Sequence, residues 1–220
     1  TGCGKSTLVN LIPRFYDVTD GKIMIDGKDI RNVSQHELRE KLGYVPQKAV
    51  LFSGDIASNI LYGNPDGSEA EMTEAATIAQ ATEFIEQKKK KYKSTISQGG
   101  SNVSGGQKQR LSIARAIAKH PDIYIFDDSF SALDYKTDAT LRAKLKEKTS
   151  ESTVMIVAQR ISTILHADQI IVLDDGQIVG KGTHKELLKN CEAYYQIASS
   201  QLSEKELEED LKEVESYAKR

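Results

Sequence analysis

With 220 residues, 39% of them hydrophobic, the chain is long enough to bury a sizeable core as one large domain or two small ones. Its 30 Lys and Arg residues against 32 Asp and Glu give a formal net charge of −2, so no overall field attracts nucleic acid or an anionic membrane. No apolar stretch is long enough to span a bilayer, and the two cysteines, Cys3 and Cys191, favour a reducing, cytosolic setting over a disulfide framework. The first residue is not Met, which predicts that the chain is an excerpt from a longer polypeptide.

The N-terminal half combines a glycine loop, short strands and a helical block. Residues 2–7 run straight into an apolar-periodic stretch, which predicts a loop followed by a helix. Alternating or apolar runs at 22–26 and 42–45 predict two strands. From about 53 to 118 the pattern is helical, with a capping box at 68–71, so we expect a helical insertion here.

Three later apolar runs are typical of parallel strands buried on both faces. They lie at 123–126, 153–157 and 169–173 and alternate with helical patterns. This alternation predicts an α/β fold with a mostly parallel sheet. After the last run, residues 174–176 predict a turn that leads back as a hairpin.

Two charged segments have plain interpretations. A capping box at 203–206 opens a helix within 201–220 whose many charges favour a solvated surface, with a partner-binding helix as the alternative. The lysine run 88–91 is interpreted as a solvated loop, because lysines without interleaved aromatic residues form no platform for nucleic acid.

The strongest functional signal stands at the start of the chain. Residues 1–7 match G-x-x-x-x-G-K-[ST] extended by one threonine, and lack only the first glycine and one variable residue. Glycines allow successive backbone N–H groups to converge on phosphate oxygens, the helix behind them adds its positive end, and a lysine reaches the terminal phosphates. We therefore predict a nucleoside triphosphate site formed by Thr1, Gly2, Cys3, Gly4, Lys5, Ser6 and Thr7.

Two further motifs point to the same chemistry. The strand predicted at 123–126 ends in Asp127, a candidate Mg²⁺ ligand together with the Ser6 hydroxyl. A second junction of paired glycines with a helix suits another anion and consists of Ser104, Gly105, Gly106 and Gln107. A monomer has no evident use for two phosphate-type helix ends, whereas a head-to-tail dimer would use each of them once.

Taken in order, these motifs resemble the nucleotide-binding domain of ATP-binding cassette (ABC) transporters. The resemblance rests on Gly-Cys-Gly-Lys-Ser-Thr, Tyr-Val-Pro-Gln at 44–47, Ser-Gly-Gly-Gln at 104–107, Ile-Phe-Asp-Asp at 125–128 and Ser-Ala-Leu-Asp at 131–134. It covers almost the whole chain. The flanking sequences at 45–52 and 180–187 are most similar to the exporter branch.

The resemblance implies a P-loop NTPase core that lacks its N-terminal strands, over residues 1–200, with the helical subdomain inserted at about 53–118 and a charged helix at 201–220. It implies that two such domains sandwich two molecules of ATP with Mg²⁺. Each site combines the phosphate loop of one domain with the signature of the other, which in this chain is Ser-Gly-Gly-Gln at 104–107. Gln47 is then the residue that senses Mg²⁺ and couples to the transmembrane domains, and the loop ending at Asp134 crosses to the opposite site. It places the transporter in the cell membrane, with this domain on the cytoplasmic face.

Two departures from the family pattern affect the expected reaction. Asp128 stands where the family usually has a glutamate that orients the attacking water, and Gln159 stands where it has a histidine. A carboxylate one methylene shorter is displaced by about 1 Å, which can lower the rate about a hundredfold, and an amide lacks the switchable charge of imidazole. The pattern resembles the degenerate-site subunit of heterodimeric multidrug-type exporters, so we predict a nearly silent site of its own and a signature that completes a non-identical partner's site.

Three other functions are alternatives to a transport ATPase. In a binding module, ATP would only close a dimer and gate a membrane partner without turnover. A cassette protein of DNA repair would need a long coiled coil between the phosphate loop and the signature, and the roughly hundred residues there leave no room for one. A translation-associated cassette would favour a tandem copy and a basic surface, and the sequence has neither.

Overall fold

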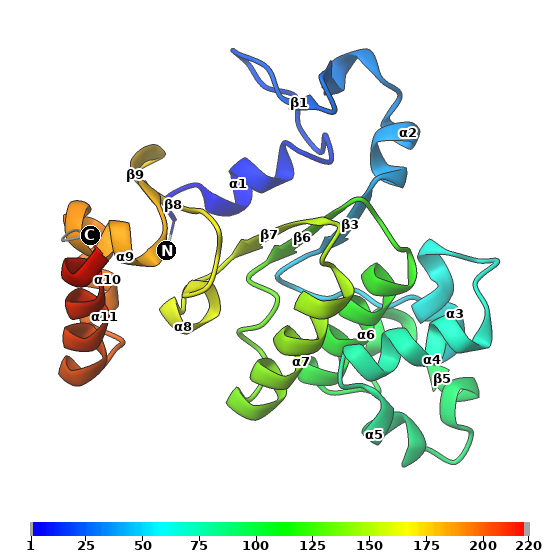
Figure 1. Ribbon diagram of the computed structural model, residues 1–220. Coiled ribbons are helices and arrows are strands. Elements are labelled where there is room, and N and C mark those ends of the chain that lie inside the picture. The colour runs from blue at the N-terminus through cyan, green and yellow to red at the C-terminus, as the bar shows by residue number, and fades with distance from the viewer. Residues whose placement is uncertain (1, 218–220) are drawn as a thin grey trace. The chain divides into compact units, whose positions relative to one another are not determined.

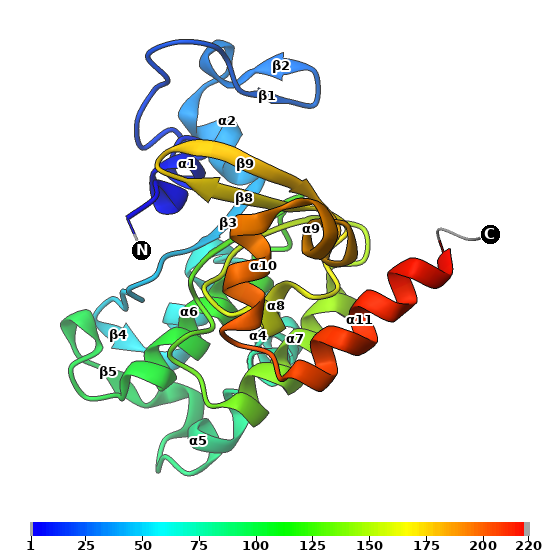
Figure 2. The same cartoon turned by 90° about the vertical axis from the view of Figure 1, so that its left-hand side faces the viewer.

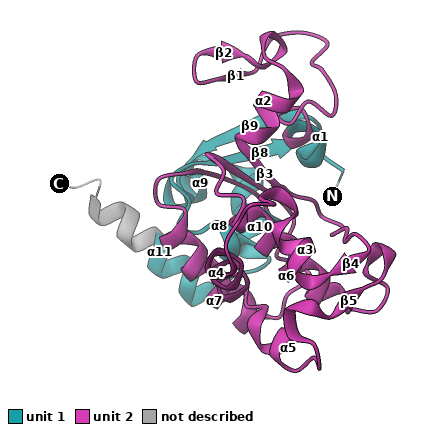
Figure 3. Ribbon diagram, turned by 90° about the vertical axis from the view of Figure 1, so that its right-hand side faces the viewer, with its two compact units in different colours: residues 1–8, 158–220 teal, residues 9–157 magenta. Residues whose placement is uncertain are grey.

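The computed structural model describes residues 2–217, so Thr1 and the last three residues lie outside the described part of the chain. The chain divides into two compact units, residues 9–157 and residues 1–8 together with 158–220 (Figure 3). Helix α1 (Lys5–Asn10) follows the glycine loop and runs across this division.

A three-stranded parallel sheet is the centre of the larger unit (Figure 1). Its strands are β3 (Leu42–Val45), β6 (Ile123–Asp127) and β7 (Thr153–Val157), in the order β3-β6-β7. The expected strands at 42–45, 123–126 and 153–157 are thereby confirmed, including their parallel pairing. Because parallel strands present their carboxyl ends at one edge, the residues after β3 and β6 are brought together there.

Helices accompany this sheet in the larger unit. They are α2 (Gln35–Glu40), α3 (Ile56–Ile60), α4 (Glu69–Ile78), α5 (Thr82–Glu86), α6 (Gly105–Ala118) and α7 (Tyr135–Lys148). Helix α6 packs against α3, α4 and strand β3 and buries Leu111, Ile113 and Ile117 in the main core. Segment 53–118 is thus mainly helical, as expected, with one small antiparallel pair of β4 (Gly54–Asp55) and β5 (Thr95–Ile96).

Capping boxes, in which two residues three positions apart bond to each other's backbone N–H groups, explain where several helices begin. Ser68 accepts from the Glu71 backbone N–H while Glu71 accepts from the Ser68 backbone N–H, which is the predicted capping box of α4. The same reciprocal pair starts α2 at Ser34. Each pair satisfies two N–H groups that the first turn of a helix leaves without partners.

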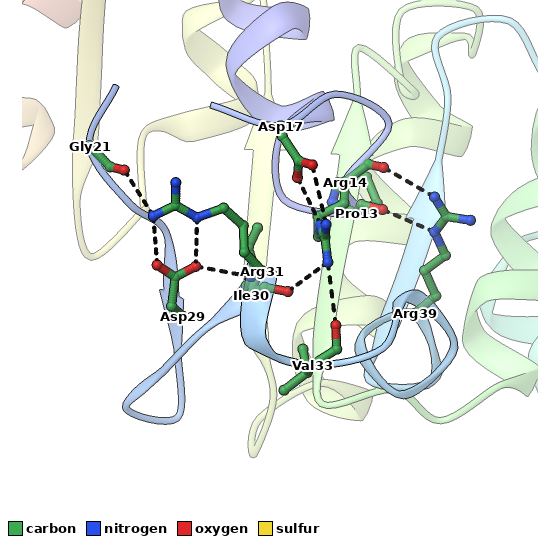
Figure 4. Close-up of polar contacts among 9 residues, drawn as sticks. All are labelled: Pro13, Arg14, Asp17, Gly21, Asp29, Ile30, Arg31, Val33 and Arg39. Carbon is green, nitrogen blue, oxygen red and sulfur yellow. Dashed lines mark hydrogen bonds and ion pairs between the residues drawn. The ribbon is translucent and has the colours of Figure 1, made fainter. Parts of the chain in front are cut away.

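Arginine side chains hold together the segment between α1 and α2, which contains one small hairpin (Figure 4). Arg39 of α2 donates to the carbonyl oxygens of Pro13 and Arg14, and Arg14 donates to those of Ile30 and Val33. The strand expected at 22–26 is reduced to β1 (Met24–Ile25), which pairs with β2 (Lys28–Asp29). Charged donors therefore satisfy carbonyls that a short hairpin cannot pair.

In the smaller unit, one expectation was wrong. The run at 169–173 was predicted as a parallel strand buried on both faces, but β8 (Ile170–Asp174) pairs antiparallel with β9 (Gln177–Gly182) (Figure 2). Ile170 and Val172 are buried, whereas Ile171 between them is 46% exposed, so only one face is covered. The predicted turn at Asp175 and Gly176, both at positive φ, explains the pairing because it returns the chain directly beside β8.

Four helices complete the smaller unit: α8 (Ile161–Ile164), α9 (His184–Asn190), α10 (Glu192–Ser199) and α11 (Glu204–Tyr217). Leu187, Tyr194 and Leu207 belong to its separate core. The capping box expected at 203–206 is present at the start of α11. Among residues 2–217, no helix is both long and apolar enough to cross a membrane.

Candidate nucleotide-binding site

The glycine loop has a backbone that only glycine adopts readily. Gly2 and Gly4 have φ values of 88° and 90°, in the left-handed region that L side chains rarely occupy. A Cβ at Gly2 would meet no atom within 4 Å, so the requirement there is conformational rather than steric. The loop then enters α1, whose first residues are Lys5 and Ser6.

The Lys5 side chain turns back toward the glycine loop that precedes it. Its Nζ donates to Cys3 Sγ at 3.1 Å, and this hydrogen bond, with the ammonium charge, holds the pKa of the Cys3 thiol below its ordinary value. The lysine therefore already stabilises negative charge at the position where the motif predicts phosphate. Thr7 follows on the same helix, and the predicted contact of Thr1 lies outside the described residues.

In the larger unit, the parallel sheet brings together two predicted catalytic residues. Gln47 follows β3 and Asp128 follows β6, and the Gln47 Nε2 donates to Asp128 Oδ2 at 3.1 Å. Asp128 has a φ of 47°, and its backbone N–H donates to the Val157 carbonyl at 3.0 Å. Asp127, the last residue of β6, is only 4% exposed. Two neighbouring carboxylates and one amide therefore stand at the carboxyl edge of the sheet.

The pKa of Tyr44 is changed by burial and by the charge at this edge of the sheet. Its hydroxyl donates to Asn10 Oδ1 at 2.8 Å, and its ring packs edge-on against Phe15. Burial, with the charge of Asp127, raises the pKa of Tyr44 to about 12. The phenol thus remains protonated and neutral at physiological pH.

The signature residues form the N-terminus of α6. Ser104 is the N-cap: its Oγ accepts from the Gln107 backbone N–H at 3.2 Å, and the Gln107 Oε1 accepts from the Ser104 backbone N–H at 3.2 Å. The capping box was not anticipated, although its spacing, serine followed three residues later by glutamine, is visible in the sequence. The Ser104 oxygen accepts within the helix, so its hydrogen can still be donated to an anion.

The two glycines of the signature are not required by the fold. Neither Gly105 nor Gly106 has a positive φ. A Cβ at Gly105 would meet nothing within 4 Å, and one at Gly106 would lie 3.5 Å from the Ala132 carbonyl oxygen, an ordinary contact. By contrast, a Cβ at Gly43 would lie 2.7 Å from Pro121, so that glycine serves packing. The conformation and packing of the larger unit therefore do not require glycine at position 105 or 106.

The loop after Asp128 is ordered by its own hydroxyls and carboxylates. Ser131 Oγ donates to the Asp128 carbonyl at 2.9 Å. Asp134 is the N-cap of α7, and the hydrogen bond from the Thr137 backbone N–H, 3.0 Å long, lowers the pKa of Asp134. The predicted role of Asp134 toward nucleotide stays a prediction, and its capping role is an additional one.

Gln159 belongs to the smaller unit and lies two residues after the end of β7. Its side chain is exposed, and its backbone carbonyl accepts from the Gln201 Nε2 at 2.9 Å. Gln201 also accepts from the Ile161 backbone N–H at 2.9 Å. The predicted site residues thus belong to different units of the chain. The glycine loop and Gln159 lie in the smaller unit, and the larger unit contains Gln47, Asp127, Asp128 and the signature.

Sequence reasoning missed two buried polar side chains beside Gln47. Ser129 is 0% exposed and Gln109, on α6, is 2% exposed. Ser129 Oγ donates to the Val45 carbonyl at 2.9 Å, and Gln109 Nε2 donates to the Pro46 carbonyl at 3.3 Å. Both stand among polar or charged neighbours in the sequence, so no local pattern indicates that they are buried.

The donor set suits magnesium better than a tightly caged metal. Within the described part of the chain, no group of three or more His, Cys, Asp or Glu side chains could hold a metal ion. Asp127 and Ser6 each offer an oxygen donor, and Mg²⁺ is usually bound through one or two such ligands together with substrate phosphates. Each of these oxygen donors is of a type that Mg²⁺ binds, and their joint role in holding the ion stays a prediction.

The profile of the family described as ABC transporter matches residues 1–131. This chain belongs to the ABC transporter family. An uncharacterized ABC transporter ATP-binding protein of Mycobacterium tuberculosis, and one of Mycobacterium bovis, are each 49% identical over 204 residues, which is 91% of this chain and 35% of the relative. A Staphylococcus aureus protein, named a multidrug export ATP-binding/permease protein, is 45% identical over 201 residues, again 91% of this chain and 35% of the relative.

A solved structure shows the same fold. It is described as a bacterial Atm1-family ABC exporter with ATP bound, and it matches with a TM-score of 0.89 and 41% identity over 93% of this chain. This ABC chain spans 36% of that exporter chain and about a third of the length of the relatives above. The expected P-loop NTPase core with its parallel sheet is thereby confirmed.

Proposed function

We propose that this chain is the ATP-binding domain of an ABC exporter, in which ATP draws two such domains together and drives transport through transmembrane domains. The similarity to an ATP-bound exporter supports the ligand, and Gly2, Gly4 and Lys5 supply the phosphate-binding loop. Asp127 and Ser6 would hold Mg²⁺, which neutralises phosphate charge when it is bound. As the ATP-binding domain of such an exporter, the chain would lie on the cytoplasmic face of the membrane.

One observation carries the proposal beyond simple nucleotide binding. Gly105 has open space around its missing Cβ and no positive φ, so the fold would accept another residue there. A helix N-terminus kept bare in this way suits the close approach of phosphate oxygens to backbone N–H groups. Because the glycine loop already provides one phosphate site, this second helix end is assigned to the ATP held by a second nucleotide-binding domain.

The division of the chain follows from this assignment. Residues 1–200 would form the nucleotide-binding domain, 53–118 its helical subdomain and 201–220 a charged C-terminal helix. Gln47, hydrogen-bonded to Asp128, would report the occupancy of the site to the transmembrane domains. The balanced net charge of −2 supports protein and nucleotide partners rather than nucleic acid.

The chain's own site is proposed to turn ATP over slowly. Asp128 must orient the attacking water with a carboxylate one methylene shorter than glutamate, and Gln159 cannot carry the charge of a histidine. The signature has no comparable change and would complete a competent site on a non-identical partner. The pair would then hydrolyse ATP mainly at one of its two sites.

Restoring both residues tests this asymmetry. Asp128→Glu combined with Gln159→His is made in the full-length transporter, with the partner's phosphate-loop lysine replaced so that only this chain's site is followed. The ATP hydrolysis rate of that site should rise by about tenfold or more, since a correctly placed general base contributes about a hundredfold or more. The measurement is phosphate release at saturating ATP. The matched control, Asp168→Glu with Gln169→His, makes the same chemical changes at two exposed positions and should leave the rate unchanged.

The outcomes separate the claims. An unchanged rate in the restored transporter removes the degenerate-site proposal but leaves ATP binding in place. A Lys5→Ala transporter that binds a fluorescent ATP analogue as well as the unaltered one removes the nucleotide site itself.

A second function is favoured by the same two departures. If ATP acts only to close the dimer, the chain would be a non-hydrolytic module that gates a membrane partner. In that case ATP would drive association of the two domains, while phosphate release by the unaltered transporter with its partner would stay at the background rate.

A further inference from the structure

The two residues before Gln47 each have a carbonyl group that accepts a hydrogen bond from a buried side chain. The two donors come from different parts of the larger unit. Ser129, after β6, donates to the Val45 carbonyl at 2.9 Å and lies 3.3 Å from the Asp127 carbonyl. Gln109, on α6, donates to the Pro46 carbonyl at 3.3 Å. With 0% and 2% exposure, both side chains are shielded from water.

Proline explains why side chains are needed at this point. Pro46 has no N–H group, so the backbone between β3 and Gln47 cannot be anchored through a donor there and only its carbonyls remain. The Pro46 carbonyl belongs to the planar peptide that links Pro46 to Gln47. Fixing its oxygen therefore fixes the plane from which the Gln47 side chain starts.

We propose that Ser129 and Gln109 are positioning residues that hold Gln47 against Asp128. Their hydrogen bonds orient the Val45–Pro46 segment so that the Gln47 Nε2 stays 3.1 Å from Asp128 Oδ2. Gln109 and the signature lie on the same helix, because Ser104 is the N-cap of α6. This helix therefore connects the signature to the hydrogen bond that positions the peptide before Gln47. This inference rests on the proposed function and adds a physical link between the two ends of the ATP sandwich.

The test uses the full-length transporter with its partner and follows nucleotide release rather than turnover. The phosphate-loop lysine of the partner is replaced, so that only this chain's site retains a fluorescent ATP analogue. The rate of release is measured with Mg²⁺ and with EDTA. Ser129→Ala and Gln109→Met each remove one donor at nearly constant volume, and each should speed release in Mg²⁺ about fivefold, the effect of one lost hydrogen bond.

A double-mutant comparison distinguishes positioning from general stability. In a Gln47→Ala transporter, neither substitution should change the release rate further, because both act through Gln47. Thr149→Val is the matched control: it removes another buried hydroxyl, whose Oγ1 donates to the Leu145 carbonyl at 2.8 Å at the end of α7. It should leave release unchanged even where urea unfolding shows an equal loss of stability.

Three results would overturn the inference. One is a release rate in Mg²⁺ that Ser129→Ala, the smaller change, does not alter. Another is an effect that persists in full in the Gln47→Ala background. The third is an equal effect of Thr149→Val. A transporter that binds no analogue before any substitution would instead refute the proposed function, so the two failures are distinguishable.

Discussion

Lys5 and Cys3 share a hydrogen bond of 3.1 Å that affects the chemistry of the cysteine thiol. The ammonium stabilises the thiolate form of Cys3 and so lowers its pKa. The same ammonium is the group that the motif assigns to the terminal phosphates. At the scale of single residues, the state of Cys3 therefore reports where Lys5 is.

Alkylation of Cys3 checks this pairing. Because the pKa of the thiol is lowered, the thiolate forms at lower pH, and the alkylation rate of Cys3 should rise at a lower pH than in Lys5→Met. The measurement is iodoacetamide labelling against pH, read by mass spectrometry. Cys191, which is 6% exposed, is the internal control and should stay unmodified in the folded protein. Superimposable profiles for Cys3 in the two proteins would contradict the pairing.

At the scale of elements, α6 has two functions in one helix. Its N-terminus carries the signature, and its body packs against α3, α4 and β3. The Ser104 capping box already supplies the structural needs of the N-terminus, so the two glycines behind it are free to serve a ligand. Stability and function can therefore be separated at this position.

Gly105→Ala makes that separation measurable. Alanine has open space and a higher helix propensity, so the free energy of unfolding should rise by about 0.5 kcal/mol or stay constant. ATP-driven association with the partner domain should weaken, because a methyl group then stands between the helix end and phosphate. Urea unfolding and analytical ultracentrifugation with ATP give the two quantities. A loss of stability with association intact would reverse the interpretation.

At the scale of the whole molecule, the chain consists of two compact units with separate cores. The core of the smaller unit contains a polar link in which His184 contacts Tyr194 Oη at 2.8 Å and Asp210 Oδ2 at 3.1 Å. A carboxylate only accepts, so the Nε2 of His184 carries a proton and donates to Asp210 Oδ2. Burial raises the pKa of Tyr194 to about 12, which keeps this phenol a donor.

His184→Ala tests whether the two units respond separately. It leaves the buried Tyr194 hydroxyl without its histidine partner, which should cost the smaller unit about 2 kcal/mol. Hydrogen exchange should then show lost protection in β8, β9 and α9, with β6 and β7 unchanged. As a control, His166→Ala changes a histidine that is not buried and should alter neither unit. Equal loss in both units would show that they unfold together.

Local signals predicted local structure well. The capping boxes at 68–71 and 203–206 and the strands at 42–45 and 153–157 were all readable, because their hydrogen bonds or apolar runs involve near neighbours. The hairpin that follows the run at 169–173 is confirmed, whereas the parallel orientation and two-sided burial expected for this run are wrong, since apolar content does not show on how many faces a strand is covered.

The motifs alone were enough to place this protein among the ABC transporters, because phosphate binding requires particular residue types at short, fixed spacings. The contact of Gln47 with Asp128, between residues separated by 81 positions, depended on the parallel register of β3 and β6. The hold of Ser129 and Gln109 on the Val45 and Pro46 carbonyls, and the open space at Gly105, likewise appeared only in three dimensions. Long-range packing decides which distant groups meet, and spacing along the chain does not encode it.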